Sequence, residues 1–253
     1  MYKFKFKELI LLTNKKKIQK NVIFFFYGLG LSSYDFKDIL YNKSPKQIII
    51  AELPGHNNLP FKKYNDNILE FTKQIFLLIK KKNIKNIVYF SHSLGGLVPI
   101  LLHKFFLKKK IKIIKFINYE GNLTKHDTKM VTKKTASYKE IEFYSKFENL
   151  LKICKESKKL DLNLWFNSMC KTSAMAFYFL SKDAVRYSKD DILLRYFRIF
   201  FKEKIYLYGS LSKRYLPNCR YGSVREELYG CGHFGHYENS FEFNKIFNKL
   251  IIK

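Results

Sequence analysis

Residues 89–96 read Tyr-Phe-Ser-His-Ser-Leu-Gly-Gly, and this stretch decides the expected fold. An apolar run, Asn86 to Phe90, leads into it, and a long apolar helical pattern begins at Leu97. A strand, a turn that holds a serine between small residues, and then a helix form a nucleophile elbow, whose strained turn exposes the serine hydroxyl. We therefore predict that Ser93 is a nucleophile at the end of a buried strand.

The small residues of this turn are Ser91 and Gly95, two positions on either side of Ser93. The turn requires small side chains there because the strand and the helix close tightly against each other. The usual motif has glycine at both positions, so Ser91 is a departure from it. Serine is small enough for that position, and the surrounding strand–turn–helix pattern supports the same interpretation.

Strand and helix patterns alternate along most of the chain. Runs rich in Ile, Val, Phe and Tyr predict strands at Phe6 to Leu12, Val22 to Tyr27, Gln47 to Glu52, Asn86 to Phe90, Ile113 to Tyr119, Lys204 to Tyr208 and Val224 to Tyr229. Helical patterns occupy Tyr34 to Tyr41, Asp66 to Lys81, Leu97 to Lys108 and Ser240 to Ile252. This α/β alternation predicts a mostly parallel twisted sheet flanked by helices, with functional residues at the carboxyl ends of the strands.

The length of 253 residues suits one structural domain. The stretch 121–200 breaks the alternation, because it is lysine-rich, has several helical patterns and contains the single tryptophan, Trp165. We interpret it as a helical cap, inserted into a core made of residues 1–120 and 201–253.

The chain is strongly basic, with a formal net charge of +27 from 48 basic and 21 acidic residues. Nearly all the basic residues are lysines, scattered from Lys3 to Lys253. This pattern favours compositional drift on a solvated surface, with attraction to an acidic protein, such as an acyl carrier protein, or to an anionic lipid surface as the alternative. No nucleic acid is expected as a partner, because arginine, which phosphate and base contacts favour, is scarce.

The cysteines, at positions 154, 170, 219 and 231, form no C-x-x-C pair and lie at no metal-ligand spacing with histidine. We expect free buried thiols in a reducing cytoplasm, and neither a metal nor a cofactor. The apolar run Leu9 to Leu12 is too short for a secretion signal. No apolar stretch reaches the roughly 18 residues of a spanning helix, so no transmembrane segment is expected.

A histidine follows the last predicted strand, in the segment Gly230-Cys-Gly-His-Phe234. A general base for Ser93 is needed at such a strand end, so we predict that role for His233, with His236 as the nearby rival. The remaining histidines do not lie at a predicted strand end beside the serine and are expected to be structural or on the surface; they are His56, His103 and His126.

An oxyanion hole needs two backbone N–H groups, one from the residue after the nucleophile and one from a loop after an earlier strand. Leu94 supplies the first, and Leu29, in the glycine-rich loop after Val22 to Tyr27, is predicted to supply the second. The loop also matches part of a dinucleotide-binding fingerprint, with Gly28, Gly30 and Glu52. Ser33 replaces the third glycine of that fingerprint, and a nucleotide would have no use for the predicted serine and histidine.

Four segments, in order and at suitable spacing, resemble the α/β-hydrolase superfamily: Tyr27-Gly-Leu-Gly30, Glu52-Leu-Pro-Gly-His56, Ser91-His-Ser-Leu-Gly-Gly96 and Gly230-Cys-Gly-His-Phe234. The resemblance covers nearly the whole chain. It implies an α/β-hydrolase fold with an esterase-like core, a cap inserted after the strand that ends near Tyr119, and the roles given above. Two departures are Tyr27, where many members have histidine, and Ser91.

The triad acid departs from the superfamily's common pattern. Many members have an aspartate in a Gly-x-x-Asp turn after the strand that corresponds to Lys204 to Tyr208, and here that turn reads Gly209-Ser-Leu-Ser212. Some hydrolases have the acid after the preceding strand, where this chain has Glu120. We predict Glu120 as the acid, because a carboxylate at a strand end fits the orienting role. Asp127 is the second candidate, and loss of the acid is the third possibility.

These residues predict a serine hydrolase that cleaves a carboxylic ester or thioester through an acyl-enzyme on Ser93. A narrower alternative is an esterase for an acyl carrier protein-linked substrate, as in the pimeloyl-ester demethylating step of biotin synthesis that superfamily members perform. Another is a binding module that has lost its acid and catalysis.

Overall fold

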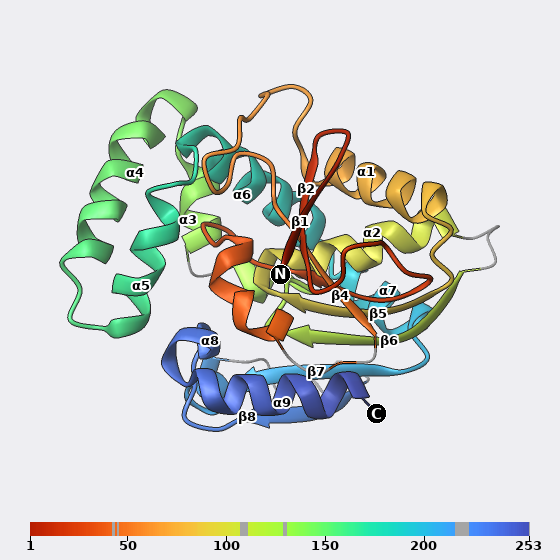
Figure 1. The fold of residues 1–253 in the computed structure, drawn as a ribbon. Coiled ribbons are helices and arrows are strands. Elements are labelled where there is room, and N and C mark those ends of the chain that lie inside the picture. Colours follow the sequence, from red (N-terminus) through yellow and green to blue (C-terminus); the bar gives the residue numbers. More distant parts are fainter. Residues whose placement is uncertain (42–43, 45, 107–110, 129–130, 216–222, 253) are drawn as a thin grey trace.

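Among the residues that the computed structural model describes, eight strands form one sheet, in the order β1-β2-β4-β3-β5-β6-β7-β8 (Figure 1). The structure describes residues 1–253 except 42–43, 45, 107–110, 129–130, 216–222 and 253. Strands β3 to β8 are parallel, and β2 is antiparallel to both β1 and β4. The strands are β1 (Tyr2–Phe6), β2 (Leu9–Thr13), β3 (Asn21–Phe26), β4 (Gln47–Ala51), β5 (Asn86–His92), β6 (Lys112–Tyr119), β7 (Lys204–Gly209) and β8 (Val224–Leu228).

The first predicted strand, Phe6 to Leu12, is wrong. The structure divides this run between β1 and β2, which form an antiparallel hairpin in which Phe6 pairs with Leu9. Lys7 has a positive φ of 51°, as the first residue of such a tight two-residue loop requires. Lysine gives no sign of this conformation, so the apolar pattern alone does not reveal the turn.

Helices cover both faces of the sheet. They include η1 (Ser33–Tyr41), α1 (Ile68–Lys81), α2 (Leu97–Phe106), α8 (Gly235–Glu238) and α9 (Ser240–Ile252). Side chains alternate in direction along a strand, so the aromatic residues of β3 and β5 pack against helices on both faces of the sheet. Phe90 lies 5.0 Å from Phe247 of α9, measured between ring centroids, whereas its neighbour Tyr89 contacts Phe116 and Phe201, at 6.1 and 6.4 Å, in the other layer.

A long helical segment separates β6 from β7. Its elements are η3 (Lys125–Thr128), α3 (Val131–Ser137), α4 (Glu140–Lys155), α5 (Leu160–Met169), α6 (Ala174–Ser188) and α7 (Ile192–Phe200). Figure 1 shows α3 to α6 gathered at one end of the sheet, whereas α7 packs on α2. The division into a core and an inserted cap remains a prediction.

The cysteines differ partly from the expectation. Cys154 and Cys231 are free and buried, but Cys170, which follows the last residue of α5, is exposed. Cys219 lies outside the described residues. Within the described part of the chain, no helix has both the length and the apolar character needed to cross a bilayer.

Candidate active site

Ser93 occupies a sharp turn between β5 and the helical segment that follows it. It is the first residue of η2 (Ser93–Gly96), which leads directly into α2. Its φ of 52° is uncommon for a residue with a side chain, as expected for a strained turn. A Cβ atom on Gly95 would lie 2.2 Å from the backbone oxygen of Phe26, so only glycine allows this close approach of helix and strand. The geometry is the strand–turn–helix arrangement predicted for Ser93.

His233 and Glu120 lie together at the same end of the sheet. Nδ1 of His233 is 2.8 Å from Oε2 of Glu120, within hydrogen-bond distance. Glu120 directly follows β6, and His233 lies in the loop after β8. The carboxylate is almost fully buried, with 8% of the Glu120 side chain exposed, and 20% of the His233 side chain is exposed. The structure thus brings together two of the three side chains predicted as a triad.

The end of β7 holds the Glu120 carboxylate in place. Its second oxygen, Oε1, accepts a hydrogen bond of 2.8 Å from the backbone N–H of Gly209, the last residue of β7. The backbone N–H of Glu120 donates to the carbonyl of Leu207, at 3.0 Å. Glu120 therefore emerges from β6 but lies against the strand after which the superfamily commonly has its acid.

Asp127, the second candidate for the acid, has a local structural role. Its Oδ2 atom accepts hydrogen bonds from the backbone N–H groups of Leu123 and Thr124, at 2.9 and 2.7 Å. These bonds stabilise the turn before η3. Ser212 lies in η4 (Ser210–Tyr215), and its hydroxyl has no charge with which to orient an imidazole.

No hydrogen bond joins Ser93 Oγ to His233 among the described residues. The two segments nevertheless touch through His92, whose Nε2 atom lies 2.8 Å from the carbonyl oxygen of His233. The rings of His92 and His233 are 4.7 Å apart between centroids. Because hydrogen bonds between a nucleophile and its base are often long before substrate binds, this placement is compatible with catalysis.

His236, the rival base, is part of the core. It is buried, and neither ring nitrogen has a hydrogen-bond partner among the described residues. Burial lowers the pKa of its imidazole well below the usual value, so the ring is neutral. Its ring lies 4.3 Å from that of Phe36 and 4.1 Å from that of Tyr237, between centroids. Of the two histidines, the structure pairs His233 with a carboxylate.

The glycine-rich loop after β3 lies directly beside Ser93. A Cβ atom built on Gly28 would be 2.7 Å from Cβ of Ser93 and 3.2 Å from its Oγ atom. Leu29 is the next residue of this loop. On the other side, Leu94 is the second residue of η2, and N–H groups at a helix start have no partner within the helix. The two predicted oxyanion donors therefore lie on the two segments adjacent to Ser93.

The side chain of Glu52 holds the glycine-rich loop after β3 through hydrogen bonds. Its buried carboxylate accepts hydrogen bonds from the hydroxyl groups of Tyr27 and Ser33, and from the backbone N–H of Ser33 at 3.0 Å. Burial raises the pKa of this carboxyl above its usual value. Because both oxygens are used within the protein, the geometry favours the oxyanion-loop interpretation of Gly28, Gly30 and Glu52 over the dinucleotide fingerprint.

His56 also supports the loop, a role more specific than the structural one expected from the sequence. Its Nε2 atom accepts a hydrogen bond of 3.0 Å from the backbone N–H of Gly30. Its Nδ1 atom lies 3.0 Å from the carbonyl of Pro54, so the proton is on Nδ1. Burial lowers the pKa of His56 to about 4, which keeps Nε2 available as an acceptor. His103 is half-buried against Phe200, and His126 is exposed.

Trp165 of α5 contacts both sides of the site and was not predicted as a site residue. Its Nε1–H group donates to the carbonyl of Leu29, at 3.2 Å. Its ring lies 5.2 Å from that of Phe234, the neighbour of His233. The segment between β6 and β7 therefore contacts the glycine-rich loop and the histidine loop together. The single tryptophan of a lysine-rich stretch is the sequence signal that points to this residue.

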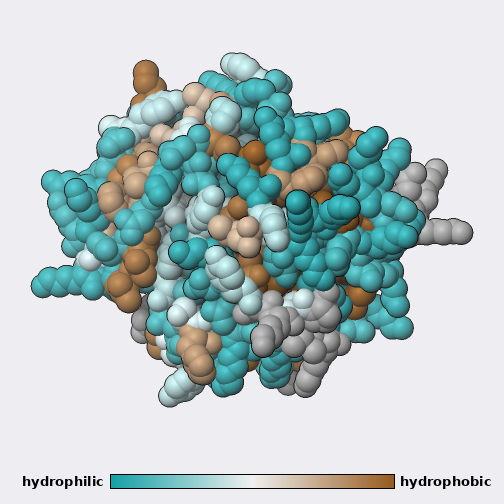
Figure 2. All heavy atoms as spheres, in the orientation of Figure 1, coloured by the Kyte–Doolittle hydropathy of each residue, from teal (hydrophilic) through white to brown (hydrophobic). Residues whose placement is uncertain are grey.

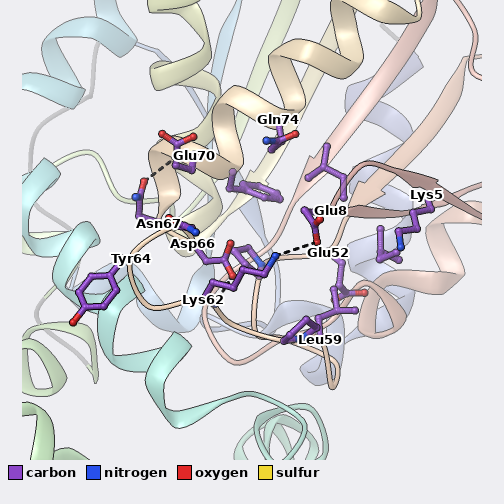
Figure 3. A pocket seen from close by; sticks show the side chains of 16 residues that line it. Lys5, Glu8, Glu52, Leu59, Lys62, Tyr64, Asp66, Asn67, Glu70 and Gln74 are labelled. Carbon is purple, nitrogen blue, oxygen red and sulfur yellow. Dashed lines mark hydrogen bonds and ion pairs between the residues drawn. The ribbon is translucent and has the colours of Figure 1, made fainter.

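A separate pocket of about 510 Å³ lies between the β1–β2 turn and the start of α1 (Figure 3). Charged side chains at its rim include Glu8 and Lys62, which form an ion pair. Glu52 also lines it, but Ser93, Glu120 and His233 do not, so this pocket is distinct from the candidate site. The described residues contain no cluster of three or more side chains suited to hold a metal ion.

No protein-family model matches the chain, and no curated protein is similar to it in sequence. Many solved structures are similar in fold. A carboxylesterase structure from the thaumarchaeon Nitrososphaera gargenis has 16% identity and a TM-score of 0.67, over 96% of this chain and 94% of that one. An esterase from Exiguobacterium antarcticum has 14% identity and a TM-score of 0.68, over 97% and 96%. MenH from S. aureus has 14% identity and a TM-score of 0.65, over 96% and 97%.

These neighbours are α/β-hydrolases, and each matches nearly the full length of the chain. The chain therefore has the α/β-hydrolase fold, which confirms the predicted fold class. At these identities the likeness establishes the fold, and the function has to be argued from the residues of the site.

Proposed function

We propose that this protein is a serine hydrolase that cleaves a carboxylic ester or thioester through an acyl-enzyme on Ser93. The observation that carries the proposal is the 2.8 Å hydrogen bond between His233 and Glu120, at the sheet end where Ser93 occupies its turn. A nucleophile, a base and an orienting acid are the three groups of a catalytic triad for this chemistry. The names of the structural neighbours, which include esterases, support an ester-type substrate.

The proposed reaction begins when Oγ of Ser93 attacks the substrate carbonyl carbon and His233 Nε2 takes the hydroxyl proton. The resulting oxyanion accepts hydrogen bonds from the N–H groups of Leu29 and Leu94. When the intermediate collapses, the bond to the leaving group breaks and His233 protonates the departing alcohol or thiol. Water, deprotonated by His233, then attacks the acyl-enzyme. The bond between the acyl carbon and Oγ of Ser93 breaks, His233 returns the proton to Oγ, and the acid is released. Glu120 orients the imidazole and stabilises its protonated form.

A small chromogenic ester and a fluorophosphonate probe test this proposal. We expect the parent protein to hydrolyse p-nitrophenyl acetate and to be labelled on Ser93, and Ser93→Ala and His233→Ala to lose both properties by a factor of about 10³ or more. Ser181→Ala is the matched control, since Ser181 is a buried serine whose hydroxyl has no hydrogen-bond partner among the described residues. Folded parent protein that is neither labelled nor active would contradict the proposal and favour a binding module.

The narrower substrate, an acyl group on an acidic carrier protein, rests on the net charge of +27. On the face shown in Figure 2, hydrophilic residues lie on most of the coloured surface, with smaller hydrophobic areas between them. The excess of basic residues supports general attraction to an acidic partner. If a carrier protein delivers the substrate, turnover of a carrier-linked ester should fall steeply with salt, while turnover of p-nitrophenyl acetate should not. An equal salt response of both substrates would exclude this version.

A reducing cytoplasm remains the predicted location.

A further inference from the structure

The serine that departs from the usual elbow motif makes a buried hydrogen bond. Ser91 is fully buried, and its Oγ atom donates to Oδ1 of Asn118, at 2.8 Å. The two residues are direct partners in the pairing of β5 with β6. Glycine, which is usual at this position, has no side chain to make this bond. Ser91 therefore does more than fit a small slot, because it links the elbow strand to the strand that ends in Glu120.

Asn118 continues this link to the turn that holds Glu120. Its Nδ2 atom donates to the backbone carbonyl of Gly121, at 3.3 Å. The amide is enclosed, since Asn118 is fully buried and a Cβ atom on Gly96 would lie 2.8 Å from its Oδ1 atom. A buried amide with both ends hydrogen-bonded has one orientation, so it transmits the position of the elbow to the turn.

The Glu120 turn has a second attachment to the elbow. The backbone N–H of Asn122 donates to the carbonyl oxygen of Ser93, at 3.1 Å. Between the two attachments, Glu120 has a φ of 42°, a conformation that a residue with a side chain keeps only where its surroundings fix it. The contacts of Asn118 and Asn122 on either side supply such surroundings.

We propose that Ser91 and Asn118 are positioning residues, which hold the Glu120 carboxylate in register with Ser93 and His233. The inference rests on the proposed function and deepens it. Its physical reason is strand order: β6 lies next to β5, so an acid placed after β6 is within reach of a side chain on the elbow strand. An acid placed after β7 would be one strand further away. The serine in the elbow and the unusual position of the acid are then parts of one arrangement.

The test is a double-mutant cycle between Ser91→Ala and Glu120→Gln. The quantities measured for each variant are the rate of fluorophosphonate labelling, and kcat and KM for p-nitrophenyl acetate. We expect Ser91→Ala to lower kcat and the labelling rate about three- to tenfold in the parent background, with KM unchanged. In the Glu120→Gln background the same change should have less than a twofold effect, because the group being positioned is already disabled. Ser181→Ala, the matched buried serine, should leave the rates unchanged in both backgrounds.

Two further variants keep the inference testable if Ser91→Ala does not fold. Ser91→Gly introduces the residue that is usual at this elbow position and should behave like Ser91→Ala. Asn118→Asp keeps the acceptor for Ser91 but places an oxygen against the carbonyl of Gly121, so it should lower kcat by a similar or larger factor. The thermal midpoint of each variant identifies any that is unfolded.

Equal factors for Ser91→Ala in the parent and Glu120→Gln backgrounds would overturn the inference, as a merely structural serine acts independently of the acid. Parent-like rates in both Ser91 variants and in Asn118→Asp would also overturn it. If these variants react like the parent while labelling still depends on Ser93, the inference alone fails and the proposed function stands. If the parent shows no labelling that depends on Ser93, the proposed function fails and the inference fails with it.

Discussion

Glu120 Oε2 lies 2.8 Å from Nδ1 of His233, although the two residues are 113 positions apart in the chain. The other carboxylate oxygen is fixed by the N–H of Gly209, so the glutamate bridges from the end of β6, across the end of β7, to the loop after β8. One side chain thus spans the position where an acid after β7 would be expected. The length of glutamate suits this span, since it reaches both the strand end and the imidazole.

Shortening or neutralising Glu120 should therefore lower activity without unfolding the protein. We expect Glu120→Gln to reduce kcat/KM for p-nitrophenyl acetate by about 10²–10⁴, because an amide does not stabilise the protonated imidazole. Glu120→Asp should have an intermediate effect, since a shorter side chain cannot reach Gly209 and His233 together. Asp127→Asn is the control and should retain parent activity; a larger loss in Asp127→Asn than in Glu120→Gln would identify Asp127 as the acid.

Trp165→Phe should lower kcat for p-nitrophenyl acetate about two- to tenfold, because phenylalanine keeps an aromatic ring but loses the hydrogen bond to the carbonyl of Leu29. Phe166→Leu, on the neighbouring half-buried residue of α5, is the control for general changes in that helix. Because Trp165 is the single tryptophan, its fluorescence reports the same contact directly. Emission that is unchanged by fluorophosphonate labelling, together with full activity of Trp165→Phe, would show that this contact does not serve the site.

Acid should destabilise the protein partly through His56. Its pKa is about 4 in the folded state, below the usual 6.5, so between these values the unfolded chain binds a proton that the folded protein does not. This stabilisation is complete above pH 6.5 and is lost as the pH falls toward 4. Between pH 7.5 and 5 the unfolding free energy of the parent should fall by about 2 kcal/mol more than that of His56→Gln.

Urea unfolding at the two pH values measures this difference. Burial also lowers the pKa values of His92 and His236, but both residues are present in parent and variant, so the comparison isolates His56. The same fall in parent and His56→Gln would mean that His56 does not titrate as its burial implies.

Cys231 should be unreactive although it lies two residues from His233. Burial, with a smaller contribution from Glu238, raises the pKa of its thiol to about 12, so almost no thiolate exists at pH 8. Iodoacetamide should modify the exposed Cys170 and leave Cys231 unmodified, with activity retained. Peptide mass spectrometry measures both sites, and labelling in guanidinium chloride shows that Cys231 is detectable. Rapid modification of native Cys231 with loss of activity would contradict this prediction.

The sequence was most informative where a function requires a local pattern. The elbow at Ser93 needs a strand, small flanking residues and a helix within about a dozen positions, so neighbouring residues alone predict it. The alternation of strand and helix patterns likewise predicted a mostly parallel sheet, which the structure confirms. The turn at Lys7 escaped this kind of prediction, because its left-handed backbone is carried by a residue that rarely signals it.

Relations between distant segments were decided by the tertiary structure. The sequence offered Glu120, Asp127 or no acid, and the choice depends on which carboxylate the strand order brings to His233. The bond between Ser91 and Asn118 depends on the register of β5 against β6, and the contact of Trp165 with Leu29 depends on how α5 packs. A periodic pattern determines which side of a strand is buried, but it contains no information on which strand lies beside it. The sequence by itself therefore determined the strand–turn–helix segment at Ser93 and the fold class, and only the packing of the sheet decided which residues lie beside Ser93 and His233.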